Sequence, residues 1–338
     1  MLRRAAAGVA DCVFALRPLL WIPAVALVDA GRLSGLSLGA RARPTSLADA
    51  FAAGAPLDGA VRAELLALLA LLGAVHLANA ARDRDTDLLN RKGRLTAWGL
   101  VGRARLMGLG AGCLLAGLVL ALRSAPVALW VLGAAAVLGA AYVVPGIELK
   151  RRAGLDLTAN AIGYGGVAFL LGASARGGGG LSHGTAMGWA LAMAPYVLGV
   201  ASIALCTMAA DRAGDEAVGF RTTAVVLGEA RARWLATALA GGSGLLGFCA
   251  ADMVPTLWGV LAGIWIAVAG KRLSGRDAWN RAAIGLQASF LVILATRAWF
   301  PLVFATVVGA ASSLYYFARF RDAYPAASMG RRGAEGGR

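Results

Sequence analysis

The feature that most constrains this chain is a succession of long apolar segments separated by short polar breaks. A helix that crosses the hydrocarbon core of a bilayer needs about 20 consecutive, mostly apolar residues. Segments of about that length lie at residues 13–31, 60–82, 100–122, 125–145, 153–174, 185–210, 231–250, 253–270, 280–298 and 300–318. Because backbone polar groups in lipid need partners inside the chain, such segments fold as helices. The sequence therefore predicts an all-α, polytopic transmembrane helix bundle.

The predicted number of helices is nine or ten. Only the corner Trp299-Phe300-Pro301 separates the last two segments, which could form one bent or re-entrant element. Composition agrees with a membrane protein, since 59% of the residues are hydrophobic and 15% are charged, whereas soluble domains have about 45–50% and about 25%. We expect one transmembrane domain over residues 1–320 and a disordered basic tail over residues 321–338.

The formal net charge of +15 is explained by membrane orientation. No long Lys/Arg run with interleaved aromatic residues occurs, so we expect no nucleic-acid partner. Basic residues of membrane proteins collect in cytoplasmic loops. With ten spans and a cytoplasmic N-terminus, the basic residues on the outer side are Arg32, Arg41, Arg43, Arg62, Arg123, Arg176 and Arg297. The remaining Lys and Arg fall at or near the inside, which predicts a multi-pass protein of the cell membrane in this orientation.

An acidic segment closes the second predicted helix. Asn79, Asp83 and Asp87 recur every four residues, so on a helix they share one face. Oxygen ligands at a membrane boundary suit Mg²⁺, which binds one or two carboxylates, waters and substrate phosphates. The alternative is a charged helix end whose aspartates pair with Arg82 and Arg84. We favour the metal site, because ionisable groups at membrane depth are costly and commonly functional.

A second acidic segment closes the sixth predicted helix, where Asp211 and Asp215 are again four residues apart. In the predicted topology both segments face the cytoplasm. They suggest two related halves on either side of a central cavity, as a parallel repeat would give. Two such acidic faces could hold Mg²⁺ ions bridged by a diphosphate, because the metals would relieve repulsion among the carboxylates.

Basic residues lie near both acidic segments. Arg94 follows the first, Lys150 closes the fourth predicted helix, and Arg221 follows the second. Guanidinium and ammonium groups suit phosphate oxygens, although each of these residues could instead be a cytoplasmic anchor. Arg17 lies inside the first apolar segment and needs an anionic partner there, so we expect it to face the cavity.

Taken in order, these motifs resemble those of the UbiA superfamily of intramembrane prenyltransferases. The matching segments are Arg17-Pro18, Asn79 to Asp87, Arg94 to Gly99, Tyr142 to Pro145 with Leu149-Lys150-Arg151, Asn160 to Gly165, and Asp211 to Thr222. The resemblance extends over about residues 16–228. The chain departs from the family pattern where Ala80 replaces an aspartate and where the second motif lacks its leading acid.

The resemblance implies Mg²⁺-dependent transfer of a prenyl group, within the membrane, from an allylic prenyl diphosphate to a lipophilic or aromatic acceptor. It assigns the metal to Asn79, Asp83, Asp87, Asp211 and Asp215, of which the four aspartates are catalytic. It assigns the diphosphate to Arg17, Arg94, Lys150 and Arg221. The cavity residues are Tyr142, Asn160 and Tyr164. The two tyrosines are candidates to face a prenyl cation, or are interfacial anchors.

Two other functions remain open at this point. A UbiA-like membrane terpene cyclase would ionise the same diphosphate and capture the cation within the prenyl chain, and the incomplete acidic motifs keep this possibility open. An ion-coupled secondary transporter would also use carboxylates inside the membrane. Transporter sites lie near the bilayer midplane, however, whereas the acids here cluster at helix ends on one side.

Overall fold

The computed structural model describes residues 2–38, 59–90, 92–174, 186–272 and 274–321. Across these ranges the chain is helical and has no named strand. The helices are α1 (Leu2–Ala15), η1 (Pro18–Trp21), α2 (Ile22–Leu38), α4 (Gly59–Arg82), α5 (Arg84–Leu89), α6 (Arg94–Ala97), α7 (Arg103–Ala121), α8 (Pro126–Val143), η2 (Leu149–Arg151), α9 (Leu155–Asn160), η3 (Ala161–Val167), α10 (Ala168–Ser174), α11 (Ala186–Ala217), α12 (Thr223–Cys249), α13 (Met253–Ala269), η4 (Gly270–Arg272), α14 (Arg276–Leu294) and α15 (Phe300–Phe320).

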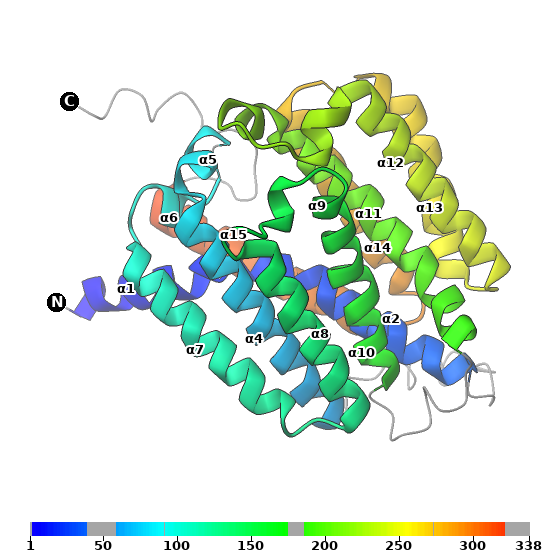
Figure 1. Cartoon of the computed structure of the whole chain (residues 1–338), viewed down its shortest axis with the longest axis horizontal. Coiled ribbons are helices and arrows are strands. Elements are labelled where there is room, and N and C mark those ends of the chain that lie inside the picture. Colours follow the sequence, from blue (N-terminus) through cyan, green and yellow to red (C-terminus); the bar gives the residue numbers. More distant parts are fainter. Residues whose placement is uncertain (1, 39–58, 91, 175–185, 273, 322–338) are drawn as a thin grey trace.

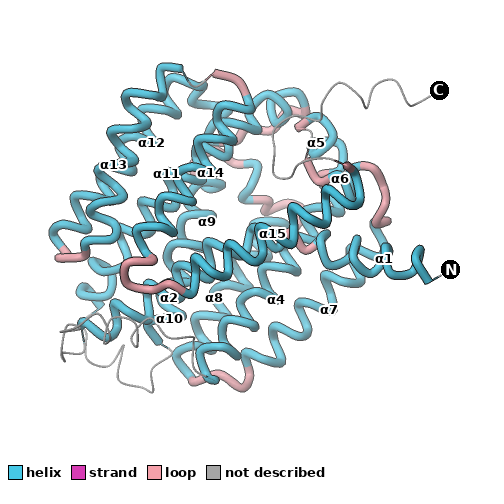
Figure 2. Tube along the Cα trace, turned by 180° about the vertical axis from the view of Figure 1, so that it is seen from behind, coloured by secondary structure: helices cyan, strands magenta, loops and turns pink. Residues whose placement is uncertain are grey.

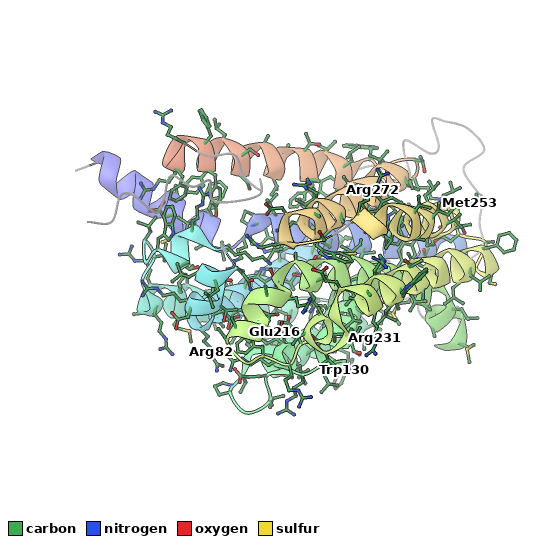
Figure 3. The ribbon with its side chains drawn as sticks, turned by 90° about the horizontal axis from the view of Figure 1, so that it is seen from above. Arg82, Trp130, Glu216, Arg231, Met253 and Arg272 are labelled. Carbon is green, nitrogen blue, oxygen red and sulfur yellow. The ribbon has the colours of Figure 1, made fainter. Side chains whose placement is uncertain are left out.

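The long helices form one bundle (Figure 1). Helix α4 packs against α7 and α8, α11 packs against α12 and α14, and α2 packs against α10. Seen from behind, α15 runs along the side of the bundle formed by α1 and α2 (Figure 2), and it contacts α2 and η1. Trp130 of α8 lies on the opposite side from α15 (Figure 3) and is 80% exposed. Such exposed apolar side chains are expected on a surface that faces lipid.

Small residues allow the closest helix crossings. A Cβ atom added to Gly172 of α10 would lie 1.8 Å from the carbonyl oxygen of Val28, and one added to Gly31 of α2 would lie 1.9 Å from that of Phe169. No side chain fits at either position, so α2 and α10 are held in backbone contact. Close backbone approach through glycine is a common way for helices to associate in lipid.

Seven helices among the described residues are long and apolar enough to cross a membrane. They span Gly8–Ser34, Val61–Arg82, Arg103–Ala121, Pro126–Val143, Leu155–Ser174, Met187–Ala217 and Phe300–Phe320. Helix α13 is apolar but shorter, with Met253–Val268 as its apolar stretch. The predicted all-α transmembrane bundle is confirmed. The two last predicted segments are separate helices, α14 and α15, and α15 is long enough to be a span of its own.

The first predicted span, 13–31, is not continuous. Helix α1 ends at Ala15, the 3₁₀ turn η1 follows, and α2 begins at Ile22. Arg17 lies at the break with φ 56° and ψ 58° in the left-handed region. A proline disfavours the α conformation in the residue before it and is well suited to the first position of a new helix. Pro18 therefore explains why α1 ends here and why the backbone of Arg17 is not α-helical.

Two further differences place polar residues inside helices. The sixth predicted segment, 185–210, extends to Ala217, so Asp211 and Asp215 are both part of α11. The fifth contains a π-helical stretch over Ala161–Val167, a form that is frequent at functional sites. The predicted tail beyond residue 321 lies outside the described residues, as do Arg41, Arg43 and Arg176 of the predicted outer side.

Candidate active site

A cavity of about 350 Å³ lies in the centre of the bundle. Side chains of η1, α2, α4, α8, α9, η3, α11, α12, α13 and α14 line it. Its lining is polar at one end, where Arg17, Asn79 and Asp211 meet, and largely apolar elsewhere. We call this end, with the residues bonded to it, the polar mouth: Arg17, Asn79, Asp83, Asp87, Asn90, Lys92, Lys150, Asp211 and Asp215.

The first acidic segment is bound to the loop after α8 through Lys150. The Lys150 Nζ donates to Asn79 Oδ1 and to Asp83 Oδ1, at 2.6 Å in each case. Asp83 sits where the chain passes from α4 to α5, so its carboxylate lies one turn beyond Asn79. Burial lowers the pKa of Lys150, and the carboxylate of Asp83 beside it opposes that shift.

The same segment is tied to the first helix through Arg17. Its guanidinium donates to the Asp87 carboxylate, which is buried. The contact depends on Gly93, whose φ of 56° is in the left-handed region. A Cβ atom on Gly93 would lie 2.7 Å from Asp87 Oδ2 and 2.8 Å from Arg17 Nη2. The break before Pro18 thus places Arg17 at the cavity, and the absence of a side chain at Gly93 leaves room for the Arg17–Asp87 ion pair.

The two acidic segments meet across the polar mouth. Lys92 donates to the Asp211 carboxylate, and Asn90 Nδ2 lies 3.5 Å from Asp215 Oδ1. Asp215 Oδ2 also accepts from Thr222 Oγ1 at 3.3 Å. A Cβ atom on Gly214 would lie 2.2 Å from Asn90 Oδ1. The α5–α6 connection therefore fits directly against the end of α11, because the residue facing it has no side chain.

Asn90 and Lys92 are site residues that the sequence analysis missed. They lie between the acidic motif and Arg94, in a stretch that resembles an ordinary basic cytoplasmic loop. Nothing in their spacing indicates that Lys92 has a partner 119 residues further along the chain, or that Asn90 has one 125 residues further along. The available signal was weak: a lysine only five residues after Asp87, next to a segment expected to bind an anion.

The predicted cavity residues Tyr142, Asn160 and Tyr164 all line the cavity. The amide nitrogen of Asn160 donates to the Tyr142 hydroxyl at 3.1 Å. The Tyr164 hydroxyl is 2.9 Å from Nε2 of His76, which also lines the cavity. His76 was not among the predicted site residues, but its position three residues before Asn79 on α4 places it in the cavity wall. Both tyrosines therefore point inward rather than toward a lipid interface.

Two predicted diphosphate-binding residues lie apart from the cavity lining. The Arg94 guanidinium carbon is 5.5 Å from the ring centre of Trp98 and 5.9 Å from that of Phe320. Arg221 is exposed and borders a separate shallow hollow together with Arg151 and Arg152. Arg17 and Lys150, by contrast, are at the polar mouth.

The polar mouth suits a divalent cation by its chemistry. Its donors are carboxylate and amide oxygens, the ligands that Mg²⁺ takes together with water and substrate phosphate. Asp211 Oδ1 is buried and has no hydrogen-bond partner among the described residues. In that part of the chain no group of three or more His, Cys, Asp or Glu side chains is gathered closely enough to hold a metal alone. Neither acidic segment would therefore complete a coordination shell by itself, and a diphosphate could add ligands to it.

Comparisons with known proteins match the chain to one family and to solved structures of the same fold. The sequence profile of the UbiA prenyltransferase family matches residues 43–283. A UbiA homologue from Archaeoglobus fulgidus bound to GPP and Mg²⁺ aligns over 88% of this chain and 99% of its own, with a TM-score of 0.62 and 17% identity. The structure of a digeranylgeranylglyceryl phosphate synthase aligns over 88% of this chain and 98% of its own, with a TM-score of 0.58 and 15% identity. The apo structure of a UbiA homologue from Aeropyrum pernix K1 aligns over 86% of this chain and 98% of its own, with a TM-score of 0.51 and 18% identity.

A search of curated protein sequences gave no match. The fold and the paired acidic segments define an integral membrane protein built as a helical bundle around one central cavity. The family profile covers well over half of the chain and therefore identifies the family. The chain belongs to the UbiA prenyltransferase family, which confirms the resemblance found in the sequence motifs.

Proposed function

We propose that this protein transfers a prenyl group from an allylic prenyl diphosphate to a lipophilic or aromatic acceptor, in a Mg²⁺-dependent reaction inside the membrane. The observation that carries the proposal is the polar mouth, where two acidic segments and the cations Arg17, Lys92 and Lys150 lie at one end of an otherwise largely apolar cavity. A prenyl diphosphate has the matching form, with an anionic head and an apolar tail. We place the mouth on the cytoplasmic side of the cell membrane, in agreement with the distribution of basic residues.

The residues of the polar mouth have two proposed roles at the diphosphate of the substrate: some bind the metal and others bind the diphosphate oxygens. Asn79, Asp83 and Asp87 on one side, and Asp211 and Asp215 on the other, would hold the metal. Bound there, Mg²⁺ supplies Lewis-acid neutralisation of the diphosphate leaving group. Three of these carboxylates, those of Asp83, Asp87 and Asp211, are now paired with Lys150, Arg17 and Lys92 respectively. When cations occupy the carboxylates, these three side chains become available to donate to diphosphate oxygens.

The bond changes follow from an allylic substrate. The C1–O bond breaks, and the diphosphate leaves with the bonding electron pair. The positive charge that develops at C1 is stabilised by allylic delocalisation and by the faces of Tyr142 and Tyr164, because aromatic rings attract cations. The apolar walls keep water away from C1. A nucleophilic atom of the acceptor then bonds to C1 and loses a proton. Arg94 and Arg221, being outside the cavity lining, would act on a diphosphate only after the loops that carry them move.

The test is release of inorganic diphosphate from geranylgeranyl diphosphate by purified protein in detergent, with a panel of aromatic and lipid acceptors. We expect release with Mg²⁺, no release with EDTA, and loss of release in Asp83→Ala and in Asp211→Ala. The mass of the product then distinguishes transfer to an acceptor from cyclisation of the prenyl chain. Absence of release with every chain length and acceptor would overturn the proposal.

A further inference from the structure

Three aromatic side chains line the cavity at a distance from the polar mouth. Tyr196 of α11, Trp258 of α13 and Phe290 of α14 all line it. We call these three residues the aromatic floor. The Phe290 ring is perpendicular to both others, with ring centres 6.2 Å from Tyr196 and 5.8 Å from Trp258 and interplanar angles of 89° in each case. Edge-to-face contacts of this kind favour a fixed arrangement of rings.

Hydrogen bonds fix two of these rings from behind. Trp258 Nε1 donates to the carbonyl oxygen of Leu286 at 3.0 Å, and the Tyr196 hydroxyl donates to Asp252 Oδ2 at 2.7 Å. Asp252 in turn accepts from Arg297 at 2.9 Å. Trp258 is 1% exposed and Tyr196 is 3% exposed. The floor is therefore anchored to α14 and to the start of α13 and cannot be pushed aside by a longer substrate without breaking buried hydrogen bonds.

Trp258 also packs against α11, beside two other residues of the cavity lining, Gly199 and Ser243. A Cβ atom added to Gly199 of α11 would lie 3.0 Å from Trp258 Cζ3 and 3.3 Å from Ser243 Oγ. The indole thus packs directly on the α11 backbone. Phe290 is the floor residue with no hydrogen-bonding atom in its side chain and is only partly buried. Its replacement is therefore the change that lengthens the cavity with the least disturbance of buried polar groups.

Helix geometry gives the depth of the cavity. On α4, eleven residues separate Asn79 at the mouth from Leu68 near the floor, which is about 16 Å at the α-helical rise of 1.5 Å per residue. On α11, fifteen residues separate Asp211 from Tyr196, which is about 22 Å on the same basis. One isoprene unit adds four carbon–carbon bonds to a chain, or about 4–5 Å when extended. Once the diphosphate occupies the mouth, roughly three or four units fill the remaining length.

The cavity volume also favours a short prenyl chain. At about 350 Å³ it lies at the small end of the range of about 300–1,000 Å³ for ligand pockets. This volume suits one short prenyl chain with the reacting part of an acceptor. A chain of eight or more units could be accommodated only if its end left the cavity.

We propose that Tyr196, Trp258 and Phe290 form an end wall that sets the chain length of the prenyl donor, with a preference for three or four isoprene units. This inference rests on the proposed function. It adds the length class of the substrate and names the residues that decide it. The acceptor does not enter the argument, because the depth is measured along the donor chain only.

The experiment compares prenyl diphosphates of two, three, four and eight isoprene units in two assays on purified full-length protein. The first is kcat/KM for diphosphate release with Mg²⁺. The second is thermal stabilisation by unreactive thiolo-diphosphate analogues of the same lengths, which reports binding without turnover. For the unmodified protein we expect both profiles to peak at three or four units, with kcat/KM for eight units lower by at least about tenfold, a factor that corresponds to about 1.4 kcal/mol.

Two variants should move the peak in opposite directions. Phe290→Ala removes part of the wall and should shift the optimum longer by one unit or more. Ala204→Phe places a ring on the cavity side of α11, seven residues before Asp211 and so about 10 Å from it, and should shift the optimum to two units. The matched control is Phe304→Ala on α15, which makes the same change in a residue that packs against the core rather than the cavity. It should leave the profile unchanged.

Equal kcat/KM for four and eight units, or an unchanged optimum in both variants, would overturn the end wall while leaving the proposed function intact. Failure of every analogue to stabilise the protein, together with no diphosphate release, would overturn the proposed function itself. A misfolded Phe290→Ala protein would not obscure the result, because Ala204→Phe tests the same wall by shortening the cavity.

Discussion

The polar mouth and the aromatic floor are two ends of one cavity, and they are held together in different ways. At the mouth, three of the four aspartates pair with cations from other parts of the chain: Asp83 with Lys150, Asp87 with Arg17 and Asp211 with Lys92. At the floor, the rings bond to groups that belong to the scaffold, such as the Leu286 carbonyl. Ion pairs can be exchanged for a metal and a diphosphate, whereas the floor bonds have no such replacement. The comparison indicates that the mouth is built to rearrange and the floor to stay fixed.

The largest expected effect is at the mouth. Asp83→Asn removes a charge that pairs with Lys150 and that is assigned to the metal, so we expect kcat/KM for diphosphate release to fall by about 10³-fold, the scale seen when one preorganised electrostatic contact is lost. The matched control is Asp85→Asn, two residues away and exposed, which should keep nearly full activity. Equal losses in both variants would mean that the segment acts only through its total charge.

A smaller loss is expected from the buried lysine. Lys150→Gln keeps a donor near Asn79 but removes the cation, and we expect kcat/KM to fall by about 10²-fold, with a higher KM for the prenyl diphosphate. Arg152→Gln, at the exposed hollow next to it, is the control. A normal KM in Lys150→Gln would show that this lysine serves folding rather than substrate binding, and a melting curve of the same protein would then show the lost stability.

The next prediction separates the acidic segments by steric means, with no change of charge. Gly214→Ala places a methyl group where Asn90 Oδ1 now lies 2.2 Å away, so the Asn90 side chain must swing away from α11 and lose its contact with Asp215. We expect activity to fall by about tenfold or more, since displacements near 1 Å can cost up to about 10²-fold. Gly108→Ala on α7 has nothing within 4 Å of the added atom and should keep full activity. Normal activity of Gly214→Ala would indicate that the two segments need not touch.

The smallest effect is expected at the floor. Tyr196→Phe keeps the ring that closes the cavity and removes the hydroxyl that donates to Asp252. We expect a loss of about 1–2 kcal/mol in the free energy of unfolding, because a partly buried acceptor loses a partner, and an unchanged preference for donor length. Thermal melts in detergent and the chain-length series measure the two properties separately. A changed length preference without loss of stability would contradict the scaffold role assigned to that hydroxyl.

Local pattern was sufficient for the helices but not for their irregularities. Apolar segments of membrane length predicted α4, α7, α8 and α15 within a few residues, because burial in lipid depends on the composition of the segment itself. The break at Arg17 could have been found from Pro18, whose effect on the preceding residue is also local. The extension of α11 to Ala217 could not have been found in this way. Acidic residues after an apolar segment suggest that a helix ends, but here Asp215 and Asp211 contact Asn90 and Lys92 and the helix continues.

The sequence by itself determined the membrane bundle, the family motifs and the residue types of the site, because hydropathy and spacing are properties of neighbouring residues. Only the tertiary structure decided which charges pair. It brought Lys92 to Asp211 across 119 residues, and it placed Arg94 over Trp98 and Phe320 instead of in the cavity. It also placed Tyr196, Trp258 and Phe290 from three helices at one depth. Such placements depend on helix crossings set by small residues such as Gly172 and Gly214, where the backbones or loops of distant segments come into contact.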